Sequence, residues 1–179
     1  MRELALHILD IAENSIAASA SLVEIEVATD EKVLTITVTD NGKGMDEEMQ
    51  KRVAEPWATT RKTRNIGLGL PFWKLAAEMA GGAFSIRSKL GEGTRVKASF
   101  LVDCVDRAPM GDLAATIAAL MAAENTDFVL RYSRKGEGFV FDTRELKAAG
   151  IDVTRPAAIK LIRDMIRENI IITDGGTVL

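Results

Sequence analysis

Apolar and polar residues alternate along two neighbouring stretches of the chain, which predicts β-strands at residues 22–29 and 32–40. One face of the second strand carries three apolar side chains: Leu34, Ile36 and Val38. Threonines occupy the alternate positions and belong to the opposite face. Asp40 is in step with the apolar residues, so we expect its carboxylate on the covered face of the sheet, where it needs hydrogen-bond donors.

A glycine turn follows this inward-facing acid. Gly42 and Gly44 allow the backbone to approach a ligand closely, because neither carries a Cβ atom. A covered carboxylate followed by such a turn predicts a pocket for a small molecule that is rich in hydrogen-bond donors. The exocyclic amine of a purine fits this description.

The first stretch of the chain has the apolar spacing of a helix over residues 2–19. A polar stripe runs between its two apolar flanks: Glu3, His7, Asp10 and Asn14. Asp10 and Asn14 are four residues apart, so both side chains can reach one ligand. Two interpretations stay open: the stripe faces a wet cavity, or it is the solvated edge of a half-exposed helix.

A short helix is predicted over residues 46–53, with Asp46 as its N-cap. The segment 55–65 is polar and basic and has no periodicity. Its cations, with one more further along the chain, are suited either to a polyphosphate or simply to a solvated loop: Arg61, Lys62, Arg64 and Lys74.

The next helix is predicted over residues 67–80, with Pro71 in its first turn. Free backbone N–H groups at such a helix start can bind anions. Two further strands are predicted at residues 83–88 and 94–103. Thr94 is in step with the apolar residues of its strand, so it should lie on the covered side, as Asp40 does.

Composition sets broad limits on function. The 179 residues are 47% hydrophobic and 27% charged, so the chain can bury a core, and wholesale disorder is not expected. A net charge of -3, with no long run of one sign, argues against nucleic acid or an anionic membrane as the main partner. The single cysteine, Cys104, excludes an internal disulfide framework, and with a single histidine it excludes the common zinc patterns. We find no signal peptide and no membrane-spanning run, and therefore expect a cytoplasmic protein.

Four short motifs stand out in order along the chain: residues 10–14 (DIAEN), 40–45 (DNGKGM), 67–70 (GLGL) and 91–94 (GEGT). They resemble the N-box, the G1 box, the G2 box and the adenine-pocket motif of the GHKL superfamily of ATP-binding domains. This superfamily includes gyrase B, Hsp90, histidine kinases, MutL and the anti-sigma-factor kinases. Residues 55–61 (EPWATTR) are similar to the segment before the lid in many histidine kinases.

The resemblance covers residues 1 to about 103 and implies an α+β fold. The expected architecture is a Bergerat-type α/β sandwich: a mixed sheet has helices on one face, and the nucleotide lies between the sheet and a lid. The strand that often precedes the N-box helix in this superfamily is absent, so we expect another element to cover that edge of the sheet.

The resemblance also implies ATP and Mg²⁺ as ligands. It assigns Asp40 to the adenine amino group and Thr94 to the same edge of the base through water. It implies that Asn14 gives its side-chain oxygen to Mg²⁺, which keeps several waters and few protein ligands. The remaining residues that it implies on the adenine side are Gly42, Gly44 and Met45, the last packing on the ring.

On the phosphate side, the resemblance implies that the backbone of four residues holds the phosphates: Gly67, Leu68, Gly69 and Leu70. Lys62 or Arg61 is the expected cation nearby. Asp10 occupies the position at which GHKL hydrolases and anti-sigma kinases carry an acid, whereas histidine kinases usually carry an amide. An acid there favours attack on the γ-phosphate by water or a hydroxyl, although aspartate is one methylene shorter than the usual glutamate.

Met1 lies only nine residues before Asp10, so we expect a stand-alone domain without a phospho-accepting helix. His7 is the only histidine. We interpret it as a supporting or surface residue rather than an autophosphorylation site.

The rest of the chain shows no such resemblance. We predict a linker at residues 104–111 and a small α+β unit at 112–179, after an ATP-binding domain at 1–103. In this unit Asp142 begins a capping box and Thr154 caps a last helix. That helix has an apolar stripe: Ile159, Ile162, Met165, Ile166 and Ile170. The unit is interpreted as an interaction or dimerisation module, or alternatively as a cover for the ATPase sheet.

Three functions stay open at this stage. The first is a Mg-dependent ATPase in which lid closure regulates a partner protein, bound through the C-terminal unit, with a homodimer as one possibility. The second is a protein kinase acting in trans, of the anti-sigma-factor or histidine kinase-like type. The third is an ATP sensor that binds nucleotide without hydrolysis.

Overall fold

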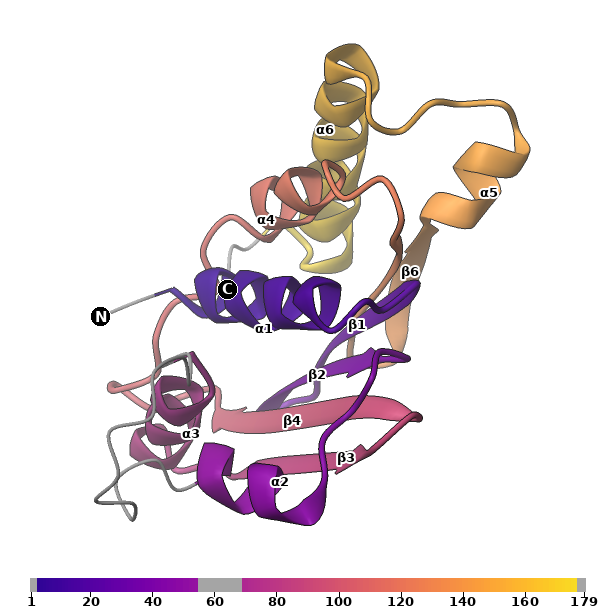
Figure 1. Ribbon diagram of the computed structural model, residues 1–179. Helices are drawn as coiled ribbons and strands as arrows, with labels where there is room; N and C mark the ends of the chain where they lie inside the picture. The colour runs from indigo at the N-terminus through magenta and orange to yellow at the C-terminus, as the bar shows by residue number, and fades with distance from the viewer. Residues whose placement is uncertain (1–2, 55–68, 177–179) are drawn as a thin grey trace.

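The computed structural model describes residues 3–54 and 69–176 (Figure 1). Six strands form one sheet in the order β3-β4-β2-β1-β5-β6. Their bounds are β1 (Leu22–Thr29), β2 (Val33–Asp40), β3 (Phe84–Lys89), β4 (Gly93–Leu101), β5 (Asp127–Arg134) and β6 (Glu137–Asp142). β1 and β5 are parallel, and every other neighbouring pair is antiparallel. The mixed sheet expected of an α+β fold is therefore confirmed.

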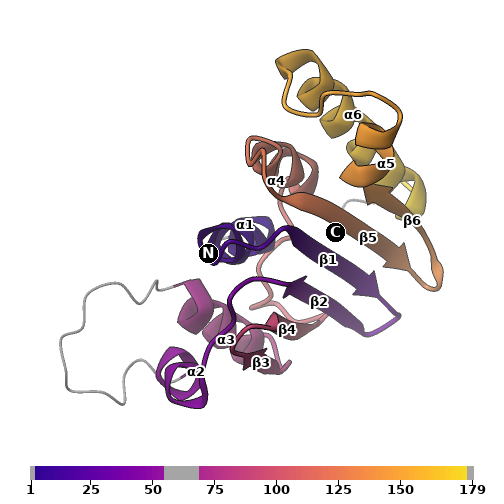
Figure 2. The ribbon, with the colours of Figure 1, turned by 45° about the vertical axis from the view of Figure 1, so that its right-hand side comes forward.

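The described helices lie on one side of this sheet. They are α1 (Leu4–Ala17), α2 (Glu47–Ala54), α3 (Gly69–Met79), α4 (Leu113–Leu120), α5 (Thr143–Ala148) and α6 (Pro156–Thr173). Helix α1 packs on the central strands β1 and β2, α3 packs on β3 and β4, and α4 lies between α1 and α6. In Figure 2 no described helix covers the opposite face of β1, β2 and β4.

The core forms where the apolar faces of the strands meet these helices. In β2 the predicted face is buried, with Leu34, Ile36 and Val38 each at most 1% exposed. Trp73 of α3 is fully buried and meets the ring of Phe84 edge-on. Burying a large apolar side chain stabilises the fold by roughly 1.5–3 kcal/mol. The period-two pattern therefore fixes which face of the strand is inside.

β5 covers the edge of the sheet at β1, which was expected to need a cover. The two strands pair in parallel along their whole length, from Leu22 opposite Asp127 to Thr29 opposite Arg134. The division into residues 1–103 and 112–179 stays a prediction. Its second part nevertheless contributes β5 and β6 to the same sheet.

The apolar stripe of α6 is largely covered within the chain. Ile162 and Ile166 are buried, and Ile159 and Ile170 are partly buried against the core. Met165 is 38% exposed. Burial of this stripe therefore requires no second protein.

The predicted caps agree with the structure in two of three cases. Asp46 accepts a hydrogen bond from the Met49 N–H at 2.7 Å, and Asp142 accepts one from the Arg144 N–H at 2.9 Å. The prediction for Thr154 is wrong. Pro156 occupies the first turn of α6, so the N-cap falls one residue later than predicted, and the Thr154 hydroxyl donates to Asp152 instead. No helix in the described ranges is both long and apolar enough to cross a membrane.

Candidate functional site

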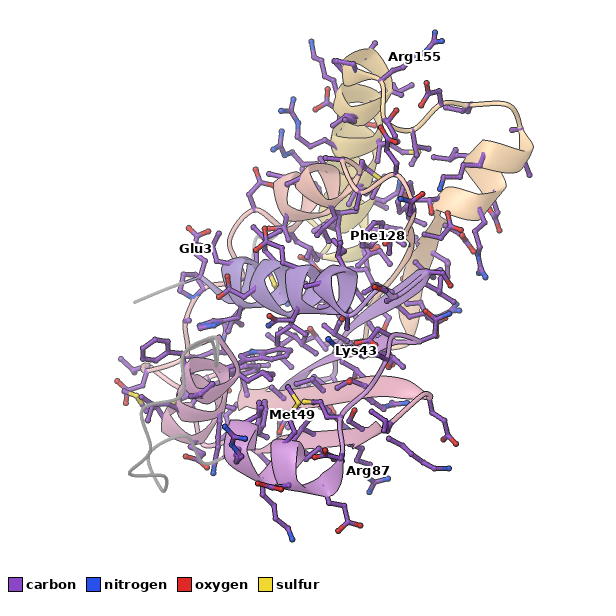
Figure 3. All side chains as sticks on the ribbon, in the orientation of Figure 1. Glu3, Lys43, Met49, Arg87, Phe128 and Arg155 are labelled. Atoms are coloured by element: carbon purple, nitrogen blue, oxygen red, sulfur yellow. The ribbon has the colours of Figure 1, made fainter. Side chains whose placement is uncertain are left out.

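A cavity of about 210 Å³ opens between α1, the turn after β2, α2, α3 and β4. Six of the residues predicted for the site line it: Asn14, Asp40, Gly44, Met45, Leu70 and Thr94. Lys43 and Met49 line it as well, and in Figure 3 both lie in the space below α1. The structure thus brings together motifs that are up to eighty residues apart in the sequence.

Asp40 ends β2 with its carboxylate at the wall of the cavity. The Ser15 hydroxyl donates to its Oδ2 at 2.7 Å, and the Gly42 N–H donates to its Oδ1 at 2.9 Å. The donors that a covered carboxylate needs are therefore present. Each oxygen keeps a further lone pair, because a carboxylate offers about four acceptor sites. Asp40 can therefore accept a hydrogen bond from a ligand amine as well.

Thr94 lies directly beside Asp40. The two residues are partners in the antiparallel pairing of β2 and β4. The Thr94 Oγ1 lies 2.9 Å from the Ser88 Oγ, and both Thr94 and Asp40 line the cavity. One end of the cavity therefore presents a carboxylate and a hydroxyl side by side, which suits the polar edge of a base.

Two glycines allow the turns around the site to approach each other. Gly44 has a φ of +65°, and a Cβ placed on it would lie 2.0 Å from the carbonyl oxygen of Lys89. Gly93 has a φ of +103°, and a Cβ there would lie 1.9 Å from the carbonyl oxygen of Asp40. Any other residue at either position would force the turns apart.

Asp10 lies one helical turn before Asn14 on α1, beside the start of α3, and is not among the residues that line the cavity. A Cβ placed on Gly69 would lie 3.2 Å from the Asp10 Cβ and 3.4 Å from its Oδ2, so the acid packs against the first turn of α3. Asn14 lines the cavity. The polar stripe of α1 therefore borders a cavity rather than only a solvated edge. Predicted roles for Arg61, Lys62, Gly67 and Leu68 concern residues outside the described ranges.

Sequence reasoning missed Ser15. It is 3% exposed, and its hydroxyl also lies 3.2 Å from the carbonyl oxygen of Ile11. The signal was available, because Ser15 follows Asn14 on a helix face that turns toward the sheet. Met49 and Val53 of α2 also line the cavity, and their spacing of four residues marked an apolar face that the sequence analysis did not use.

His7 is buried, at 4% exposure, so the interpretation as a surface residue is wrong. It lines a second, mostly apolar hollow of about 310 Å³ with Phe72 and Met79 of α3. The apolar neighbours on α3 cover the imidazole. Its place on α1 brings it close to the site without lining the site cavity itself.

The side-chain amide oxygen of Asn14, which lines the cavity, is an oxygen ligand of the kind that hard cations accept. No cluster of three or more His, Cys, Asp or Glu residues suited to a metal occurs in the part of the chain that the structure describes. Mg²⁺ usually keeps several waters and uses few protein ligands beside phosphates, so an amide oxygen at this place is compatible with that ion.

Comparison with known proteins gives a family match and several partial relatives. The family model described as "Histidine kinase-, DNA gyrase B-, and HSP90-like ATPase" matches residues 2–104. The chain is 39% identical over 82 residues to "Sensor histidine kinase YcbM" of Bacillus subtilis, covering 43% of this chain and 26% of that protein. It is 28% identical over 101 residues to a "Putative sensor protein" of Shewanella frigidimarina, covering 56% and 15%. The chain thus spans about a quarter or less of the length of these relatives.

Among solved structures, the Aquifex aeolicus MutL ATPase domain complexed with ADP matches with a TM-score of 0.51 at 15% identity. The match covers 86% of this chain and 69% of that one. The N-terminal domain of a DNA repair protein matches with a TM-score of 0.50 at 14% identity, and the match covers 79% of this chain and 52% of that one. At such low sequence identity, the likeness to these two structures shows the fold alone. Because residues 2–104 are less than two thirds of the chain, the MutL likeness extends into the part where the sequence resemblance ended.

Proposed function

Because the chain belongs to the family of histidine kinase-, DNA gyrase B- and HSP90-like ATPases, we propose that it binds ATP with Mg²⁺ in the cavity and hydrolyses it. Hydrolysis is coupled to lid closure and, through the C-terminal unit, to the regulation of a partner protein. The observation that carries the proposal is the Asp40 carboxylate, which is held by two donors at the cavity wall and has acceptor sites to spare.

In the proposed complex the adenine amine donates to Asp40, with Thr94 beside it. Met45 and Leu70 line the cavity and supply apolar contact for the base and the sugar. The phosphates extend toward the start of α3, because the backbone N–H groups of a helix's first turn and the helix dipole favour negative charge.

Asn14 supplies its side-chain oxygen to Mg²⁺, and the ion, when bound, offsets the negative charge that develops on the phosphates. Asp10 orients a water molecule and accepts its proton as the water oxygen bonds to the γ-phosphorus. The bond from that phosphorus to the oxygen bridging to the β-phosphate breaks, and ADP and inorganic phosphate are released. Asp10 packs against Gly69 at the start of α3, the direction in which the phosphates extend in this proposal.

The test is incubation with Mg²⁺ and γ-labelled ATP, with free phosphate and labelled protein followed separately. We expect Asp10→Asn to abolish phosphate release and to retain ATP binding.

Asp40→Asn should weaken ATP binding strongly, because the adenine amine loses its charged acceptor. Glu13→Gln, which neutralises an exposed acid on the same helix, is the matched control and should behave as wild type. Unchanged affinity in Asp40→Asn would refute the site assignment.

A second candidate is a protein kinase acting in trans. Several similar proteins are named as histidine kinases, among them "Sensor histidine kinase YcbM" of Bacillus subtilis, and this favours it. In the same assay this function would transfer label to a partner in cell extract rather than release phosphate. ATP binding without either product would leave only the sensor function.

A further inference from the structure

The uncovered face of the sheet carries a small cluster of cations at one edge. Arg87 extends from β3, and Arg95 and Lys97 extend from β4; all three side chains are exposed. We call these three residues the β3–β4 basic patch. Figure 2 shows that this side of the sheet is not covered by the described helices, and Figure 3 labels Arg87 at its edge.

The arrangement of the patch is unfavourable for the isolated chain. Arg87 and Arg95 are directly opposite each other in the antiparallel pairing of β3 and β4, and like charges in such pairs destabilise a sheet. In the described ranges, none of the three side chains takes part in an ion pair or a hydrogen bond. Lys89, one pleat further along, is by contrast paired with Glu92.

The patch borders an open hollow of about 260 Å³ whose lining includes Arg87 and Arg95. The charged residues Lys89 and Glu92, which pair with each other, and Asp40 also line it. Two adjacent guanidinium groups offer the fork geometry that binds carboxylates in pairs of hydrogen bonds. Unpaired arginines beside a hollow, at a cost to the fold, indicate an anionic ligand from outside the chain.

The surroundings of the patch limit the size of that ligand. On the same face, two acidic residues of β1 lie two strands from the patch: Glu24, opposite Thr39 of β2, and Glu26, opposite Thr37 of β2. Glu24 lies 3.5 Å from Arg131, which leaves a net negative charge on this group of three residues. Strands are spaced by about 4.8 Å, which places the acidic residues about 10 Å from the patch. A long polyanion crossing the sheet would meet these carboxylates, and the net charge of -3 adds to the repulsion.

We propose that the β3–β4 basic patch binds a short acidic segment of a partner protein. The positive area is small and bordered by negative charge, which fits a few consecutive Glu or Asp residues better than a nucleic acid. Asp40 and Thr94 line both this hollow and the nucleotide cavity, so the segment would bind directly behind the base. The proposal does not depend on ATP hydrolysis.

The test is fluorescence anisotropy with a labelled short polyglutamate peptide at low salt. We expect the Arg87→Gln/Arg95→Gln double variant to bind the peptide at least about tenfold more weakly than wild type, since charge-assisted hydrogen bonds are lost. The matched control is Lys32→Gln/Lys160→Gln, which makes the same charge change at two exposed lysines outside the patch. It should bind within about twofold of wild type.

Four results would overturn the proposal: no binding by wild type, equal weakening in both double variants, tighter arginine-dependent binding of a single-stranded oligonucleotide, or a marked fall in the thermal midpoint of the arginine variant. The last would mean that the arginines serve the fold. We expect instead that the midpoint stays constant or rises, because a repulsive pair is removed. Titration with ATP and Mg²⁺ should give wild-type affinity in both variants, which separates this test from that of the nucleotide site.

Discussion

Ser15 holds the Asp40 carboxylate at the wall of the cavity from another element. The two residues are 25 positions apart in the sequence, and the packing of α1 on β2 brings the Ser15 hydroxyl to 2.7 Å from Asp40. The period-two pattern was enough to predict that the carboxylate lies on the covered face and needs donors. Which residue donates was not predictable, because that depends on how α1 packs on the sheet.

Ser15→Ala should weaken ATP binding by about three- to tenfold, because Asp40 loses a hydrogen bond worth about 1 kcal/mol that holds it in place. Isothermal titration with ATP and Mg²⁺ measures the effect. Ser85→Ala, at an exposed position of β3, is the control and should bind as wild type. Equal affinities for Ser15→Ala and wild type would mean that Gly42 alone orients the carboxylate.

A buried cluster of hydrogen-bonded side chains at the end of α6 gives a second prediction at this scale. The Tyr132 hydroxyl lies 3.0 Å from both carboxylate oxygens of Asp174, and the Arg134 Nη1 lies 3.6 Å from one of them. Burial raises the pKa of Asp174, and the interactions with Tyr132 and Arg134 offset part of this rise. Burial and the neighbouring carboxylate also raise the pKa of Tyr132.

The raised pKa makes the stability of the fold depend on pH. In the unfolded chain the pKa of Asp174 is about 3.9, below its pKa in the folded protein, so the unfolded chain loses this proton first as the pH rises. The contribution of Asp174 to the unfolding free energy is therefore full below about pH 3.9 and declines as the pH rises through the folded pKa. Relative to Asp174→Asn, wild type should therefore gain unfolding free energy as pH falls from 7 toward about 4. Urea denaturation of both proteins at several pH values measures this difference. A difference in unfolding free energy between wild type and Asp174→Asn that stays the same at every pH would contradict the prediction.

At the scale of elements, most helices and strands could be predicted because their patterns are local. The strands β1 and β2 follow from period-two alternation, and Asp46 and Asp142 mark helix starts through their own hydrogen bonds. The prediction that Thr154 caps α6 is wrong because two local signals competed, and Pro156 fixed the start of the helix. The interpretation of His7 as a surface residue is wrong for a different reason, because its burial depends on parts of the chain distant in the sequence, among them α3.

Gly44→Ala tests how closely the turn after β2 must approach β3. A left-handed φ costs a non-glycine residue about 1–2 kcal/mol, and here the added Cβ would also meet the Lys89 carbonyl oxygen. We expect a loss of more than about 2 kcal/mol in unfolding free energy, together with weaker ATP binding.

Gly91→Ala is the matched control for this change. Gly91 also has a left-handed φ, of +80°, but nothing lies within 4 Å of an added Cβ. It should therefore lose only the conformational part, about 1–2 kcal/mol. Equal losses in the two variants, measured by urea denaturation, would show that the close approach adds nothing to the strain.

At the scale of the whole molecule, the parallel pairing of β1 with β5 was beyond local prediction. Residues 22–29 and 127–134 are about a hundred positions apart, and no local pattern specifies which strand will cover a given edge. From the sequence alone, only the need for a cover at the edge of β1 could be predicted. The chain supplies that cover from the part predicted to be a separate unit.

A fragment of residues 1–111 tests whether the predicted ATP-binding domain folds without the rest. Removing β5 exposes the backbone edge of β1 along eight residues, and removing α4 uncovers the apolar side of α1 that packs against it. An open edge beside exposed apolar surface promotes association between chains. We therefore expect the fragment to aggregate or to lack a cooperative thermal transition, whereas residues 1–179 give one.

The measurement is thermal denaturation with size-exclusion chromatography, followed by ATP titration of any soluble fragment. A soluble, cooperatively folding fragment with the ATP affinity of the full chain would support two independent units, with the boundary at the predicted linker 104–111. Aggregation of the fragment, with full stability of the whole chain, would mean that β5 completes the nucleotide-binding sheet. In that case any partner that contacts the C-terminal part acts on the same folded body that holds the nucleotide.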